Sequence, residues 1–387
     1  MYPYEKHDID TRMLPILSGE VVYNETVMFV GKADRARLLF DPTEILSVTS
    51  YDRRKVFEEG RDYVLDSEGR LCVTANTRIP VISEAKYWHG DESQTPSLRT
   101  MRNGEVVYTY CGEGRIMTRW QVCVSYRHKK AEGVFLPPSM ADRFESLMHR
   151  LRIGEDASIH FFGDSITAGS SASFYFGTEP HTPAYPALFC EALAKRFADT
   201  VHYVQTGLAG TYPRTSDMHD VVHGSRGVIT SVNTSVGGWN TDHALAHYRE
   251  RIGRWIGRFD CDLLVLGFGM NGKKEPEEFI ADLRTICDRA LAQKPDLALL
   301  FVATMLPNPE SVGHWVHNQA LFEEPMQALA DEYLARGVPA AVAPVTSVSK
   351  YVLSRKRFRD ISGNNINHPN DFMIRLYAQT LLNTLGL

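Results

Sequence analysis

Cysteine is scarce in this chain and shows no pattern typical of a metal or disulfide site. The 387 residues include six cysteines, Cys72, Cys111, Cys123, Cys190, Cys261 and Cys287. None belongs to a Cys-x-x-Cys pair or to another spacing that metal ligands use, and several lie inside apolar runs. We therefore expect buried free thiols and no cysteine-ligated metal.

An excess of positive charge is missing as well. The chain has 42 Lys and Arg against 47 Asp and Glu, which leaves a net charge of −5. A nucleic-acid partner is recognised mainly through its phosphates, so this balance gives no electrostatic basis for one. The basic run Arg355–Arg359 is a local exception. We interpret it as a solvated face beside a loop.

Long apolar runs are also absent. No stretch approaches the ~18 consecutive apolar residues that a membrane span needs, and the first ten residues, MYPYEKHDID, carry charges where a secretory signal has its apolar segment. We expect a cytoplasmic protein with no membrane partner, although a trimmed signal would leave the same sequence. The contents of 43% hydrophobic and 23% charged residues are typical of a globular protein, and the length allows two domains.

In the N-terminal third of the chain, apolar and polar residues alternate as they do in β-strands. Trp120–Tyr126 alternates apolar and polar residues with the period of two of a half-buried strand, and Asp66–Gly69 separates two β-rich runs as a hairpin turn does. We predict an accessory all-β sandwich, jelly-roll-like, over residues 1–135. A linker with a connecting helix follows over residues 136–154.

A group of aromatic residues in this region, Tyr87, Trp88 and His89, has two interpretations. Exposed aromatic faces would make a platform on which sugar rings stack. Aromatic side chains more often pack in a core. We favour the second interpretation, in which the β-rich domain serves as a lid or packing partner for the rest of the chain.

Beyond Glu155 strands and helices alternate. We predict the first strand over Ser158–Phe162. Leu263–Phe268 and Leu297–Met305 are continuous apolar runs of the kind found in the middle of a parallel sheet, and helical stripes lie between the strands. This pattern predicts a doubly wound α/β domain over residues 155–387. Ligands of such domains bind beyond the carboxyl ends of the strands.

The polar segment 202–226 does not fit this alternation. We interpret it as an insertion over the rim of a site, with surface decoration as the alternative, since loops of this length are usually functional or disordered. It contains His202, His219 and His223, but a third metal ligand of clear spacing is lacking, so we assign no metal.

Four short segments follow strand ends in order along this domain. They are HFFGDSITAGSSAS at 160–173, NTSVGG at 233–238, GMNG at 269–272 and NHPND at 367–371. A Gly-Asp-Ser tripeptide by itself usually makes an ordinary turn. Together and in this order, the four segments resemble the sequence blocks of the SGNH (GDSL-type) hydrolases over roughly residues 155–387.

The resemblance implies an ester hydrolase in which Ser165 is the nucleophile and His368 the base. A serine hydroxyl is a poor nucleophile at neutral pH, so a neutral imidazole must take its proton. The resemblance also implies an oxyanion hole made by the backbone N–H groups of Ser165 and Gly238 and the side-chain amide of Asn271. It implies no cofactor.

The sequence departs from the family pattern in two places. The third block usually ends in Asp, where this chain has Gly272. The family's acid lies three residues before the histidine, where this chain has Asn365, and an amide orients an imidazole without stabilising its positive form. We expect Asp360 to curl back to the ring as the acid. The alternative is a Ser-His dyad without a carboxylate.

Two tryptophans indicate the substrate. Trp239 directly follows the oxyanion glycine, and Trp315 lies in a loop after a strand end. We expect both, with Asn365, to line a polar, aromatic-walled pocket that fits a sugar ring. No long apolar lining for an acyl chain is evident, which favours a short acyl group.

The two-part layout is similar to that of some bacterial acetyl esterases that act on plant polysaccharides or their oligosaccharides. The resemblance therefore implies removal of O-acetyl groups from a carbohydrate. Two alternatives remain: a lipid or thioester hydrolase, and a non-catalytic glycan-binding protein on the same scaffold. The sequence leaves the sugar, the acylated position and the oligomeric state open.

Overall fold

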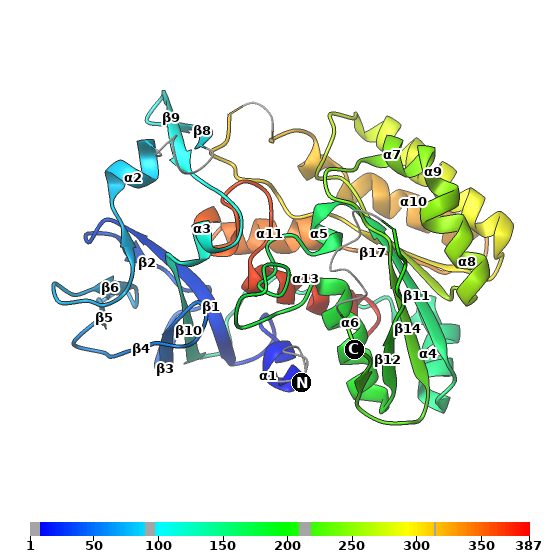
Figure 1. Ribbon diagram of the computed structural model, residues 1–387, viewed down its shortest axis with the longest axis horizontal. Coiled ribbons are helices and arrows are strands. Elements are labelled where there is room, and N and C mark those ends of the chain that lie inside the picture. Colours follow the sequence, from blue (N-terminus) through cyan, green and yellow to red (C-terminus); the bar gives the residue numbers. More distant parts are fainter. Residues whose placement is uncertain (1–7, 90–96, 209–217, 313–314) are drawn as a thin grey trace.

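A computed structural model describes residues 8–89, 97–208, 218–312 and 315–387 of the chain. Figure 1 shows two regions lying against each other. A β-rich region, in blue and cyan, is built from the N-terminal part of the chain, and an α/β region surrounds a central sheet.

The central sheet is parallel, as the apolar runs predict. Within the described residues its strand order is β13-β12-β14-β11-β15-β16-β17, and only the edge strand β13 is antiparallel to its neighbour. The strands are β11 (Ala157–Gly163), β12 (Thr200–Tyr203), β13 (Val221–Val222), β14 (Val228–Asn233), β15 (Leu263–Gly267), β16 (Ala298–Val302) and β17 (Ala340–Ala343). The chain returns to β14 on one side of β11 and then crosses to β15 on the other. The carboxyl end of β11 is therefore the point where ligands of such sheets bind.

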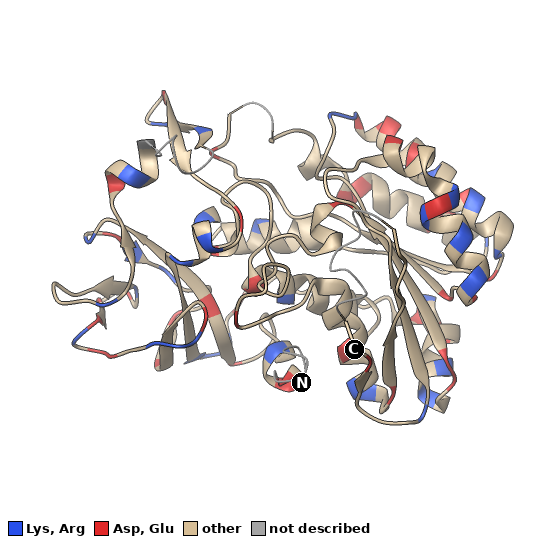
Figure 2. Ribbon diagram, in the orientation of Figure 1, with Lys and Arg blue, Asp and Glu red and all other residues tan. Residues whose placement is uncertain are grey.

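Helices cover both faces of this sheet because its strands are apolar on both sides. On β15, Leu263 and Val265 belong to one apolar core, and Leu264 and Leu266 belong to a second. The first core contains α4 (Glu145–Ile153), α6 (Tyr185–Phe197), α11 (Val345–Leu353) and α13 (Asp371–Thr384), and the second α7 (Thr241–Ala246), α8 (Arg254–Phe259), α9 (Pro276–Gln293) and α10 (Glu323–Ala335). Figure 2 shows charged residues along the outer helices and few on the sheet.

The N-terminal region is rich in β-strands, as predicted. Its main sheet has the order β4-β3-β10-β1-β7, beside a three-stranded sheet β2-β6-β5 and the hairpin β8-β9. The strands are β1 (Val21–Val30), β2 (Arg35–Ala36), β3 (Pro42–Ser50), β4 (Val56–Phe57), β5 (Tyr63–Leu65), β6 (Leu71–Val73), β7 (Val81–Ile82), β8 (Ser97–Arg102), β9 (Glu105–Tyr110) and β10 (Gln121–His128), with short helices α2 (Glu84–His89) and α3 (Arg115–Thr118). The jelly-roll arrangement and the bounds 1–135, 136–154 and 155–387 stay predictions.

The basic run 355–359 lies between the two regions, so its prediction as a solvated face is wrong. Lys356 forms an ion pair with Glu25 of β1, and neither side chain is exposed. Arg357 Nη1 lies 2.6 Å from Asp34 Oδ1. Buried charges need partners, and here the partners come from the β-rich region. The basic residues therefore hold the two regions together.

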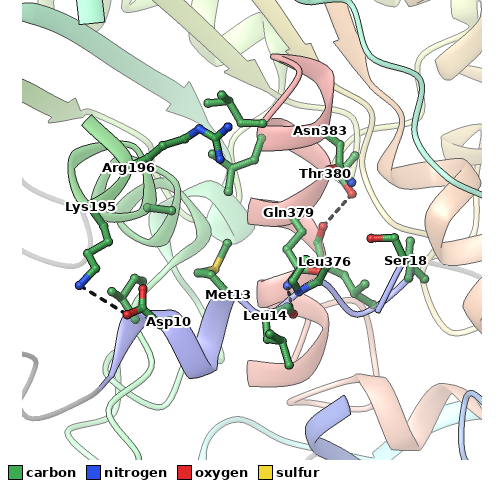
Figure 3. A pocket seen from close by; sticks show the side chains of 16 residues that line it. Asp10, Met13, Leu14, Ser18, Lys195, Arg196, Leu376, Gln379, Thr380 and Asn383 are labelled. Carbon is green, nitrogen blue, oxygen red and sulfur yellow. Dashed lines mark hydrogen bonds and ion pairs between the residues drawn. The ribbon is translucent and has the colours of Figure 1, made fainter. Parts of the chain in front are cut away.

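Helix α1 (Ile9–Met13) precedes the first strand of the β-rich region and packs on α6 and α13 of the α/β region. The side chain of Gln379 accepts a hydrogen bond from the N–H of Ile16 (3.0 Å) and donates one to the carbonyl of Leu14 (2.7 Å). A largely apolar cavity of about 370 Å³ lies among these helices, with Lys195 paired to Asp10 at its edge (Figure 3). None of its lining residues belongs to the four motif segments.

Part of the segment 202–226 is regular structure, contrary to its interpretation as one long loop. Its first residues complete β12, and Val221–Val222 forms β13 at the edge of the sheet. His202 Nδ1 lies 2.9 Å from Asp220 Oδ1. Residues 209–217 lie outside the described part, and the placement of the segment over the site rim stays a prediction.

The six cysteines are free and buried, which confirms that prediction. Of the helices in the described ranges, none combines the length and apolar character that crossing a membrane requires.

Candidate active site

Ser165 lies where the central strand β11 ends and the one-turn helix α5 (Ser165–Ala168) begins. Asp164 caps this turn by accepting a hydrogen bond from the N–H of Ile166 (2.9 Å). Before it, Gly163 packs so closely on the next strand that a Cβ would lie 2.3 Å from the carbonyl oxygen of Gly267. The strand and turn therefore present the Ser165 hydroxyl at the carboxyl end of the sheet.

Three side chains form a continuous hydrogen-bonded chain at this point. Ser165 Oγ lies 2.9 Å from Nε2 of His368, and Nδ1 of the same ring lies 2.6 Å from Oε1 of Glu113. Ser165 is buried, and the His368 side chain is 13% exposed. The structure thus brings together the two residues expected as nucleophile and base, and adds a carboxylate that sequence reasoning missed.

Glu113 comes from the β-rich region, in the turn between β9 and α3. The turn is marked by Gly112 and Gly114, both with positive φ (141° and 57°). A carboxylate between two glycines is the sequence feature that could have identified Glu113 as a candidate acid. Nothing in the linear pattern connects it with a histidine 255 residues later.

Within the described residues, three side chains donate hydrogen bonds to the Glu113 carboxylate. Oε1 accepts from His368 and from Asn364 Nδ2 (2.9 Å), and Oε2 accepts from the Ser171 hydroxyl. Burial raises the pKa of this carboxyl, but the hydrogen bonds from these groups outweigh burial and hold the pKa below its ordinary value. Glu113 is therefore ionised where it faces the imidazole.

Asn364 also shapes the loop that carries the histidine. Its Oδ1 accepts hydrogen bonds from the backbone N–H groups of Ile366 (2.9 Å), Asn367 (3.0 Å) and His368 (3.0 Å). An Asn side chain that satisfies successive N–H groups stabilises a tight turn. The turn and the Glu113 contact together fix the imidazole.

Asp360 does not reach the imidazole, so its predicted contact with His368 is wrong. Its carboxylate accepts hydrogen bonds from the N–H of Met28 in β1 (2.9 Å) and from Arg357 Nε (3.1 Å). Burial raises the pKa of Asp360, but the positive charges of Arg357 and its neighbours lower it by more. The pKa of this carboxyl is therefore below its ordinary value. The carboxylate thus serves the contact between the regions.

Asn365 also points away from the site, contrary to its expected place at the substrate. It is fully buried, and its Nδ2 donates to the carbonyl of Tyr110 (2.9 Å) and the hydroxyl of Tyr87 (3.1 Å). Tyr87 is itself buried in a small core of the β-rich region, so it offers no exposed stacking face. The side chain of His89 lies outside the described residues.

The loop after β14 runs beside the nucleophile. The N–H of Val236 donates to the carbonyl of Gly163 (3.1 Å), and a Cβ on Gly237 would lie 3.9 Å from Cβ of Ser165. Gly238 has φ +77°, a conformation that glycine adopts without strain, and open space where a side chain would be. The role of its N–H as an oxyanion donor stays a prediction.

The loop after β15 carries Asn271, whose Nδ2 donates to the carbonyl of Trp239 (3.1 Å). This bond ties the two loops expected to supply oxyanion donors. The buried side chain of Gln319 donates to the carbonyls of Met270 (3.2 Å) and Trp315 (3.0 Å). The segment with Trp315 is therefore anchored to the Asn271 loop.

Trp239 is partly buried against the second apolar core, and its expected place in a substrate pocket stays a prediction. Its ring stacks on His243 and His247, with centroid distances of 5.7 and 4.9 Å, and the Arg251 guanidinium lies 5.0 Å from its centroid. It also meets the edge of Phe162 in β11. These contacts hold the indole beside the Gly237–Gly238 turn.

The arrangement offers a hydroxyl, an imidazole, a carboxylate and amide donors, which are the groups of nucleophilic acyl transfer. Across the described ranges, no group of three or more His, Cys, Asp and Glu side chains is placed to hold a metal ion.

A comparison with curated protein sequences found no match. Among solved structures, one that resembles this chain is a two-domain esterase active on acetylated mannans, crystallised with mannopentaose. The two are 20% identical with a TM-score of 0.44, and the match covers 63% of this chain and 53% of that one, about half its length. A carbohydrate esterase of family 3 from Talaromyces cellulolyticus is 14% identical (58% and 96% covered, TM-score 0.39). A lipase/acylhydrolase from Enterococcus faecalis is 16% identical (58% and 93% covered, TM-score 0.37).

The family comparison covers the segment that holds the hydroxyl, the imidazole and the loops with Gly238 and Asn271. A model of the GDSL-like Lipase/Acylhydrolase family matches residues 161–372, more than half of the chain. The chain therefore belongs to this family of ester hydrolases.

Proposed function

We propose that this protein is a serine esterase that removes O-acetyl or other short acyl groups from a carbohydrate. The observation that carries the proposal is the 2.9 Å contact between Ser165 Oγ and His368 Nε2 at the carboxyl end of the central strand. A hydroxyl within hydrogen-bond reach of an imidazole is the arrangement that activates a serine for acyl transfer.

The reaction proceeds in two halves. His368 Nε2 takes the proton of Ser165 as its oxygen attacks the acyl carbon, and the resulting oxyanion accepts from the N–H groups of Ser165 and Gly238 and from Asn271. His368 then gives the proton to the leaving sugar oxygen, which leaves an acyl-enzyme. Water, deprotonated by the same imidazole, attacks that ester, and the carboxylic acid leaves while Ser165 regains its proton.

Two tryptophans near Ser165 support the proposed substrate class. Trp239 stands beside the oxyanion loop, and the anchored Trp315 segment lies next to it. Aromatic faces match the flat apolar faces of sugar rings. The apolar cavity of about 370 Å³ described above is lined by α1, α6 and α13 and not by residues around Ser165. These features favour a sugar ester with a short acyl group over a long-chain lipid.

Hydrolysis of p-nitrophenyl acetate and octanoate by the full chain, followed by acetate release from acetylated xylo- and manno-oligosaccharides, tests this proposal. We expect acetate to be preferred and the activity to fall about 10⁶-fold in Ser165→Ala. A fluorophosphonate probe should label the wild-type protein and not this variant. Preference for octanoate or for a thioester would contradict the substrate class, and failure to label Ser165 would contradict the enzyme proposal and favour a glycan-binding protein.

A further inference from the structure

We infer that Glu113 is the acid of this active site, contributed by the β-rich region to orient His368 and stabilise its positive form. The inference rests on the proposed function and adds a positioning residue to it. The active site is then shared between the two regions of the chain.

The hydrogen bond from the ring defines what Glu113 does. Its Oε1 lies 2.6 Å from Nδ1 of His368, so the ring proton stays on Nδ1 and the lone pair of Nε2 faces Ser165 Oγ at 2.9 Å. A carboxylate at this position selects the productive tautomer and stabilises the imidazolium that forms during attack. An amide provides the first effect without the second.

Side chains of the α/β region hold the Glu113 carboxylate in place. Both of its oxygens accept hydrogen bonds from the α/β region, from Asn364 Nδ2 and from the Ser171 hydroxyl. The backbone is held too, because the N–H of Gly112 donates to the carbonyl of Asn364 (3.0 Å). Behind it, a Cβ on Gly114 would lie 2.9 Å from the ring of Phe176. The turn is thus fitted between two loops of the other region.

A residue at the family's usual acid position, 365, does not face His368 in this protein. Asn365 has φ 62°, and its side chain is turned to the carbonyl of Tyr110. An aspartate at this position would face that carbonyl oxygen, which repels it, and would not face the imidazole. The conformation of the loop therefore explains why the acid comes from elsewhere.

The exposure of Glu113 allows a direct chemical test. Its side chain is 41% exposed, so a small carboxylate in solution has access to its place once the side chain is removed. Formate added to Glu113→Ala should restore catalysis in part, whereas Glu113→Gln fills the same space and should not respond. A role in structure alone would not produce this difference.

The experiment compares kcat and KM of wild type, Glu113→Gln, Glu113→Ala and Glu105→Gln on p-nitrophenyl acetate, with and without formate. Glu105 is an exposed carboxylate on β9, away from the histidine, and serves as the matched control. We expect kcat to fall about 10⁴-fold in Glu113→Gln with KM nearly unchanged. Formate should raise kcat of Glu113→Ala by about tenfold, a limited recovery because a free ion lacks the positioning of a side chain. The control should behave as wild type.

A double variant, Glu113→Gln with Asn365→Asp, completes the test, and it should stay as slow as Glu113→Gln alone. Wild-type rates in Glu113→Gln, no formate effect in Glu113→Ala, or recovery in the double variant would each overturn the inference. If the wild type still hydrolyses the ester and is labelled at Ser165, the proposed esterase stands without it. An inactive, unlabelled wild type instead defeats the proposed function itself.

Discussion

The β-rich and α/β regions each place a carboxylate close to the loop that carries His368, and the two carboxylates behave differently. Asp360 belongs to the same stretch of chain as the histidine, but it binds Arg357 and the N–H of Met28 and is fully buried. Glu113 is 255 residues away, yet it contacts the ring directly. Turning Asp360 to the ring would leave the Arg357 charge without this partner, which costs more than a hydrogen bond returns. Nearness in sequence therefore does not decide which carboxylate serves the histidine.

The largest effects are expected when the charge of each carboxylate is removed in turn, which tests whether Glu113 and Asp360 have different roles. Asp360→Asn should keep kcat within about tenfold of wild type, against about 10⁴-fold for Glu113→Gln, because only Glu113 contacts the imidazole. The free energy of unfolding should show the reverse order. Asp360→Asn should lose about 3 kcal/mol by leaving Arg357 with a missing partner. Urea denaturation and kcat on p-nitrophenyl acetate measure the two effects, and a large kcat loss in Asp360→Asn with unchanged stability would contradict the comparison.

Two ion pairs between the regions allow the stability contributions of a buried and an exposed contact to be compared. Glu25 and Lys356 are both fully buried, whereas the side chains of Arg54 and Glu179 are 67% and 40% exposed. Glu25→Gln should lower the free energy of unfolding by about 3–5 kcal/mol, since it leaves a buried ammonium unpaired. Glu179→Gln, the matched control, should change it by less than about 1 kcal/mol. Equal losses in urea denaturation would show that the buried pair does not hold the regions together.

The two loops expected to supply oxyanion donors belong to the α/β region, so a change there tests that region by itself. Asn271→Ala should lower kcat by about 10²–10³ and leave KM nearly unchanged, because the amide acts on charge that develops in the transition state. The free energy of unfolding should fall by about 1 kcal/mol, because the hydrogen bond to the Trp239 carbonyl is lost. Asn318→Ala, a side chain that donates to the carbonyl of Lys274 in the same loop, is the control for loop movement. A similar kcat loss in both variants would indicate loop displacement instead of a lost donor.

Asp164 gives the smallest expected effect, and it depends on pH. Burial raises its pKa from 3.8 to about 6. The folded protein therefore holds this proton more tightly than the unfolded chain, so the contribution to stability is full below pH 3.8 and is lost as the pH rises through about 6. Relative to wild type, Asp164→Asn should gain up to about 3 kcal/mol of unfolding free energy between pH 4 and 7. Urea denaturation across this range measures the gain, with the exposed Asp142→Asn as control, and a pH-independent difference would contradict it.

Sequence reasoning succeeded where a feature depends on its near neighbours. The apolar residues at β11, β15 and β16 indicated a parallel sheet, and the residues that follow β11, β14 and β15 were recognised as motif segments. It failed where the burial and the partners of a side chain depend on the other region. The basic run 355–359 has the composition of a solvated face, and only the buried Glu25 and the nearby Asp34 show otherwise.

The sequence by itself determined the parallel sheet and the order of the motif segments, including those that carry Ser165 and His368. These properties follow from periodicity and short turns, which involve residues only a few positions apart. Only the tertiary structure decided that Glu113 meets the histidine and that Asp360 does not. That choice depends on how the β-rich region docks on the α/β region, because docking determines which charge each carboxylate finds as its partner.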